Sequence, residues 1–121
     1  MFLSLAPCRL YDSRFGGNLS LKSANVRIVQ AVGLCNIPRG ARALSANITI
    51  VAPPAAGFLQ AYAGDQPPPA TSAVNFRAGQ TKANNAMIQL ALGGDGTIAL
   101  LPIFGDPGTL DVIVDVNGYV R

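Results

Sequence analysis

Apolar and polar residues alternate along much of this chain with a period of two, which is the period of side chains on a β-strand. The clearest example is the segment Ala43–Val51. One face of this segment would carry Leu44, Ala46, Ile48 and Ile50, and the other would carry Ser45, Asn47 and Thr49. The pattern predicts a strand with one face buried in a core and the other in water.

Shorter segments repeat the pattern, each bounded by residues that favour turns. They are Val26–Gln30, Phe58–Tyr62, Val74–Phe76, Met87–Leu92, a run that begins at Ile98, and Asp111–Val116. Gly93–Gly96 predicts a tight hairpin, and Pro67–Pro69 predicts a stiff extended loop. No segment has the apolar spacing of an amphipathic helix. We therefore predict an all-β fold, an antiparallel β-sandwich or barrel-like domain of about seven to nine short strands, with residues 1–121 as a single domain.

The composition predicts that part of the surface is covered. Half of the 121 residues are hydrophobic, and only 12% are charged, against about 25% in an average soluble protein. A surface so poor in charge is typical of proteins that bury one region against a partner. We therefore expect a homo-oligomer or a larger protein assembly.

The positive charge lies mostly in the first third of the chain. Six basic residues and one acidic residue occur up to Arg42, whereas three basic and five acidic residues follow it. Arg39 and Arg42 are the candidates for contact with an anionic partner such as a surface polysaccharide. The basic residues are scattered, so nucleic acid is not an expected partner. No apolar run reaches the roughly 18 residues of a membrane span, so membrane insertion is not expected, and no signal peptide is visible.

Cys8 and Cys35 are the only cysteines of the chain. They can form one disulfide, which would stabilise the fold by about 3–4 kcal/mol in the chain-entropy model, or remain two buried thiols. A disulfide is favoured, because oxidising compartments preserve such pairs. Two cysteines without histidine supply too few ligands for a metal site, and we expect neither a metal nor another cofactor.

The residue inventory argues against an enzyme. The chain has no histidine and no glutamate, so the usual base of a serine or cysteine nucleophile is missing and any acid–base pair must come from six aspartates. Half of these fall in predicted turns. Asp111 and Asp115 share a strand face, but they lie about 13 Å apart by strand rise, too far for a common site. We predict no catalytic residues.

Several polar residues are embedded in the apolar segments, where buried polar groups need partners. They are Asp12, Arg14, Asn47, Asn75, Asn84, Asn85, Asp115 and Asn117. We expect some of them to pair with each other or with turn backbone and to fix the strand register. Arg14 with Asp12 or with Asp115 is a candidate ion pair. The alternative interpretation is a polar pocket for a glycan.

These polar residues lie in five of seven groups that match a known domain, in order along nearly the whole chain. The groups are Pro7–Arg14, Gly33–Pro38, Ala43–Ile50, Ala55–Leu59, Asn75–Thr81, Ala83–Ala86 and Asp115–Tyr119. On these residues the chain resembles a repeat domain found, often in tandem, in large secreted and cell-surface bacterial proteins. The resemblance implies an extracellular, non-catalytic β-domain in which Cys8 and Cys35 are the cysteine pair. It carries over no catalytic or ligand-binding residue.

We expect a non-enzymatic structural or assembly module on an extracellular, cell or virion surface, such as a coat, decoration or filament subunit. The virion version enters because family members usually follow a signal peptide or sit within long chains, and this sequence begins at Met1 without one. The alternative is an adhesion module that binds a surface glycan or an anionic polymer.

Overall fold

Strands joined by turns and loops make up the part of the chain that the structure describes. A computed structural model describes residues 1–15, 17, 19–93, 95–105 and 107–121. Its nine strands are β1 (Phe2–Asp12), β2 (Leu21–Lys22), β3 (Arg27–Gln30), β4 (Ala43–Val51), β5 (Gly57–Ala63), β6 (Val74–Phe76), β7 (Lys82–Gln89), β8 (Thr97–Phe104) and β9 (Thr109–Val120). The predicted all-β class is confirmed. No helix in these residues is long and apolar enough to cross a membrane.

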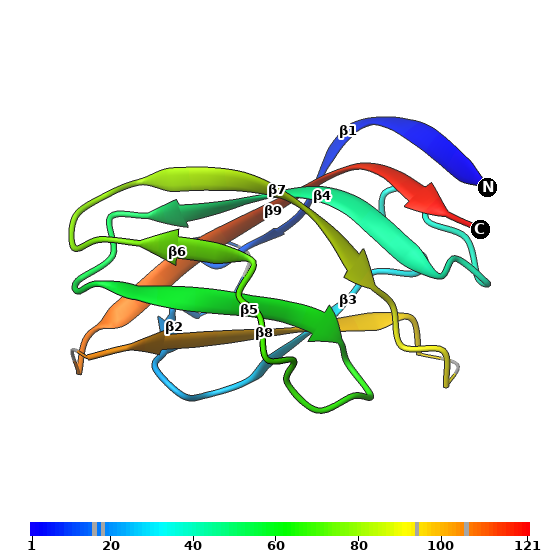
Figure 1. The fold of residues 1–121 in the computed structure, drawn as a ribbon. Coiled ribbons are helices and arrows are strands. Elements are labelled where there is room, and N and C mark those ends of the chain that lie inside the picture. Colours follow the sequence, from blue (N-terminus) through cyan, green and yellow to red (C-terminus); the bar gives the residue numbers. More distant parts are fainter. Residues whose placement is uncertain (16, 18, 94, 106) are drawn as a thin grey trace.

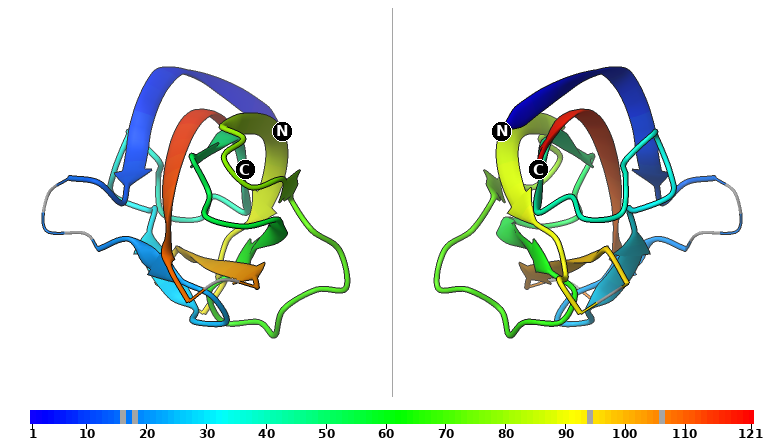
Figure 2. Two further views of the ribbon diagram at one scale, coloured as in Figure 1. Left: turned by 90° about the vertical axis from the view of Figure 1, so that its left-hand side faces the viewer. Right: turned by 90° about the vertical axis from the view of Figure 1, so that its right-hand side faces the viewer.

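Two antiparallel sheets form the layers of a sandwich (Figure 1). The first sheet has five strands in the order β1-β9-β4-β7, with the short β2 also paired to β9. The second has four strands in the order β3-β8-β5-β6. The two views in Figure 2 show β1 arching over β9 at one side of the molecule.

Alternating residues of the long strands meet between the sheets and make the core. Leu44, Ala46, Ile48 and Ile50 of β4 are fully buried, as the alternation predicted. Other strands add the buried residues Leu59, Ile98, Leu100, Leu110, Val112, Val114 and Val116. The intervening residues of each strand point to the outer face of its sheet. The sandwich therefore has two outer faces that point away from each other.

The predicted hairpin at Gly93–Gly96 is wrong, because the strands on either side belong to different sheets. β7 ends at Gln89 and pairs with β4, whereas β8 pairs with β3 and β5. Leu90 and Ala91 are buried between them and carry the chain from one layer to the other. Of that segment, Gly94 lies outside the described residues. Turn residues alone do not show whether a chain reverses within a sheet or crosses to another.

Two edge strands, β1 of the first sheet and β3 of the second, differ from the sequence-based predictions. β1 was not predicted, because Ala6 and Pro7 interrupt its alternation and leave only two short stretches on either side. Of the predicted pair Val26 and Ile28, only Ile28 lies in β3, because Val26 precedes the strand. Both side chains are about half exposed, whereas Val29 points into the core.

Candidate functional site

A row of polar side chains crosses the outer face of the five-stranded sheet. Arg9 of β1 pairs in register with Asp115 of β9, and Asp115 pairs in turn with Asn47 of β4. Asn47 then pairs with Asn85 of β7, so the row runs across four strands. The residues before and after Asn47 and Asp115 are core residues with no exposed surface. The pleat of the sheet therefore directs this row away from the core.

A bulge between β1 and β9 opens a cavity beside this row. Ser4 is opposite Gly118 and Cys8 is opposite Val116, so three residues of β1 face the single residue Asn117 of β9. One of the three is Pro7, which has no backbone N–H for the strand ladder. The cavity measures about 560 Å³, and its walls are Pro7, Cys8, Arg9, Asn47, Asp115, Val116 and Asn117. Three of the predicted polar residues, Asn47, Asp115 and Asn117, thus come together in one place.

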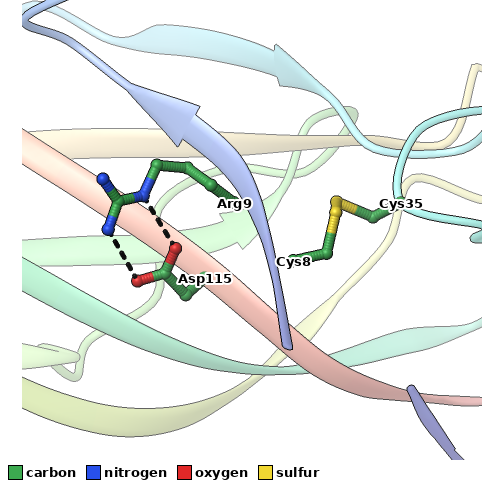
Figure 3. The surroundings of a disulfide bond; sticks show 4 residues. All are labelled: Cys8, Arg9, Cys35 and Asp115. Atoms are coloured by element: carbon green, nitrogen blue, oxygen red, sulfur yellow. Dashed lines mark hydrogen bonds and ion pairs between the residues drawn. A yellow bond between two sulfur atoms is a disulfide. The ribbon is translucent and has the colours of Figure 1, made fainter. Parts of the chain in front are cut away.

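A disulfide between Cys8 and Cys35 holds β1 at this bulge, which confirms the predicted pairing. Figure 3 shows Cys8 and Arg9 leaving β1 in opposite directions, one toward Cys35 and the other toward Asp115. Cys35 and Asn36 both have left-handed backbone conformations, with φ of 52° and 60°. The Ile37 N–H donates to the Leu34 carbonyl at 2.9 Å and closes this turn. These φ values are those of a type I′ turn, which presents the Cys35 side chain to β1.

The charges beside the cavity balance each other. Arg9 donates from Nε to Asp115 Oδ1 at 3.0 Å and from Nη2 to Oδ2 at 3.5 Å, and its Nη1 lies 3.4 Å from Asp12. Arg14 donates to Asp12 from Nε and Nη2 at 3.0 and 2.9 Å. The hydrogen bond that Arg9 donates to Asp115 raises the pKa of Arg9, and the hydrogen bond that Arg14 donates to Asp12 lowers the pKa of Asp12. The predicted Asp12–Arg14 pair is therefore present, whereas Asp115 pairs with Arg9 instead.

The strand asparagines divide into two kinds. Asn84 donates from its amide to the Ala73 carbonyl at 2.9 Å, which connects β7 to the segment before β6. Asn75 accepts from the nearby Ser72 hydroxyl at 2.9 Å. The amides of Asn47, Asn85 and Asn117 make no hydrogen bond to any other described residue. Asparagine is a poor strand former, so three such residues without a partner need another explanation.

The group Asp12–Arg14 at the end of β1 makes structural hydrogen bonds. The Ser13 hydroxyl donates to Asp111 at 2.8 Å and accepts from the Val112 N–H at 2.9 Å, which joins β1 to β9. The Ser20 hydroxyl donates to the same Asp111 oxygen at 2.6 Å. The described residues contain no group of three or more histidine, cysteine and acidic side chains that could hold a metal ion.

The structure places Arg39 and Arg42 in the segment that leads into β4, with both side chains exposed. The backbone of Arg42 donates to Val120 and accepts from Leu90. Arg39 lines a separate cavity of about 210 Å³ together with Val32 and Leu92. Neither side chain makes an ion pair among the described residues. Their proposed contact with an anionic partner stays a prediction.

The opposite outer face, on the four-stranded sheet, is apolar, and the sequence analysis did not single it out. Ile28, Ala99 and Tyr62 lie in register across β3, β8 and β5, and Ile103 lies beside Phe58. Tyr62, Ala99, Leu101 and Ile103 form a small cluster of their own outside the main core. Burial raises the pKa of Tyr62. At the β3 edge the face is open, because Val26 and Ile28 are 49% and 52% exposed.

The apolar face had one signal in the sequence. Ile28 and Val29 are adjacent, so a strand through them must place a large aliphatic residue on each face.

Gln60 lies on the apolar outer face of the four-stranded sheet, between the apolar residues. Its amide donates to the Pro69 carbonyl at 2.6 Å and fastens the proline-rich loop there.

No protein-family model matches this chain, and no curated protein matches it significantly. The resemblance to the bacterial surface repeat stays a prediction.

Proposed function

We propose that this protein is a non-enzymatic assembly module of an extracellular or virion surface, and that a second copy of the chain covers the apolar face. The observation that carries this proposal is the exposure of Val26 and Ile28 at the edge of an outer sheet face that also carries the half-buried Phe58 and Ile103. A solvent-facing sheet normally alternates apolar residues inside with polar residues outside. Contiguous apolar residues on both faces are typical of a sheet that is covered on both sides.

The edge strand β3 supports a second copy as the occupant. β3 pairs with β8 on one side, and no backbone hydrogen bond is found on its other side among the described residues. Antiparallel pairing of β3 with β3 of a second copy would join the two four-stranded sheets into one. Ile28 of each copy would then lie beside the other, and Val26 would extend the same apolar surface. Full burial of such an aliphatic side chain is worth about 1.5–3 kcal/mol.

The disulfide supports a location outside the reducing cytosol, because such bonds persist in oxidising compartments. The low charge of the chain also supports a covered surface, because proteins so poor in charged residues typically bury one region against a partner. An adhesion module is the second candidate. It is favoured by the polar cavity on the opposite face, which can act independently of the assembly.

The test is the mass of the purified protein in solution, measured by light scattering coupled to size exclusion. We expect an oligomer for the unmodified protein and a monomer for Ile28→Lys, because a charge at the centre of the interface opposes burial. Leu92→Lys is the matched control, since Leu92 is 73% exposed but does not lie on this face. It should leave the oligomer intact. A folded monomer at high protein concentration, or equal dissociation by both variants, would contradict the proposal.

A further inference from the structure

We propose that the cavity beside the β1 bulge binds a neutral saccharide. The proposal goes beyond assembly, because the cavity lies on the polar outer face of the five-stranded sheet and the apolar face belongs to the other sheet. A protein assembled through one face would present the other. The cavity volume of about 560 Å³ falls within the range of roughly 300–1,000 Å³ that is usual for small-molecule sites.

The first support is the hydrogen-bonding capacity of the walls. Asn47 and Asn117 line the cavity, and Asn85 continues the row beyond it. Each amide offers two donor hydrogens and an acceptor oxygen, and none of the three is engaged with another described residue. Such paired donors and acceptors suit the hydroxyl groups of a sugar, which themselves both donate and accept.

The second support is the absence of net charge at the site. Arg9 is 53% exposed, but both of its hydrogen bonds to Asp115 are made, and Asp12 lies near its third nitrogen. Arg14 in turn neutralises Asp12. A phosphate, sulfate or carboxylate ligand would meet the negative charge of Asp115, and the positive charge of Arg9 is already balanced by that residue. A neutral ligand can accept from Arg9 and donate to Asp115 with the pair intact.

The third support is the apolar surface around the polar groups. Among the residues that line the cavity, the exposed Pro7 adds apolar surface beside the amides. The ring of Phe2 lies against Gly118, where an added Cβ would collide with it, and Gly118 follows the cavity residue Asn117 directly. Phe2 is 53% exposed. Sugar rings have apolar C–H faces that pack against such aromatic and aliphatic surfaces.

The site is also held in shape before any ligand arrives. The disulfide fixes one end of the bulge, and the two-bonded ion pair of Arg9 with Asp115 fixes the other side of β1 (Figure 3). Asn47 stands in the centre of the sheet, between strands paired on both sides. Rigid walls reduce the entropy that binding would otherwise lose.

The experiment is a titration of the ¹⁵N-labelled protein followed by NMR. The probes are maltotetraose, cellotetraose, mannotetraose and chitotetraose, each up to about 10 mM, which covers dissociation constants in the millimolar range. Heparin is the anionic counter-probe. We expect at least one neutral tetrasaccharide to shift the side-chain amide signals of Asn47 and Asn117 with saturation. The site would be overturned if none of the four shifts them, or if heparin alone does.

A variant separates binding from folding. Asn47→Thr replaces a poor strand former with a good one, so the midpoint of thermal unfolding should stay the same or rise. The same change removes an amide from the cavity and should weaken binding about tenfold, the effect of one lost hydrogen bond. Asn75→Thr on the other sheet is the control and should leave the affinity unchanged. Unaltered affinity in Asn47→Thr would overturn the proposal, as would a marked loss of stability, which would show a structural role for the amide.

Discussion

The two outer faces of this sandwich are opposite in character, although both belong to sheets of the same core. The five-stranded sheet shows a row of charged and amide groups around a cavity, whereas the four-stranded sheet shows aliphatic and aromatic side chains. Neither surface is needed by the core. Unpaired strand asparagines reduce the stability of an isolated domain, and an exposed apolar patch makes it prone to association. The contrast indicates two separate contacts, a polar one on one side and an apolar one on the other.

The largest expected effect comes from the disulfide, which belongs to the polar side alone. In the double variant Cys8→Ala/Cys35→Ala, the free energy of unfolding should fall by about 3–4 kcal/mol, because the bond closes a segment with a sequence separation of 27. Urea unfolding measures the change, and reduction of the unmodified protein is the control that should match it. Saccharide binding should weaken while the oligomer persists. A loss below about 1 kcal/mol would show that backbone pairing alone holds β1.

An intermediate effect is expected from acid, which should also act on the polar side first. Asp12 has a lowered pKa in the folded state, so its contribution to stability is complete above the ordinary aspartate pKa of about 3.9 and is lost as the pH falls through the folded value. In Asp12→Asn the free energy of unfolding should fall by about 1–3 kcal/mol near neutral pH, because a charged acceptor of Arg14 is lost. Its stability should then decline less between pH 5 and pH 2.

Chemical denaturation across that pH range is the measurement for Asp12. Asp65→Asn is the control, since Asp65 is an exposed carboxylate in the loop after β5. It should keep the acid dependence of the unmodified protein. Parallel pH curves for all three proteins would mean that the Asp12–Arg14 pair contributes nothing measurable.

The strands that could be predicted from the sequence are those in which apolar and polar residues alternate without interruption. The segment Ala43–Val51 was predicted correctly as a strand, with its boundaries and its buried face. β4 alternates strictly because it lies in the centre of its sheet with one face in the core. β1 escaped prediction, because the bulge between Ser4 and Cys8 breaks its alternation into two short pieces. The cavity escaped for the same reason, since it depends on the register between β1 and β9. Asn47, Asp115 and Asn117 were singled out as embedded polar residues, but no local pattern shows that strands distant in the sequence bring them together.

The smallest expected effect compares two neighbouring asparagines on β7. Asn85→Thr should raise the free energy of unfolding by up to about 1 kcal/mol, because its amide has no partner and threonine is a better strand former. Asn84→Thr should lower it by about 1 kcal/mol, because the bond from the Asn84 amide to the Ala73 carbonyl is lost. Thermal and urea unfolding of the two variants measures this difference in sign. If Asn85→Thr were destabilising as well, the Asn85 amide would have a structural role. The polar row would then no longer support a ligand-binding surface.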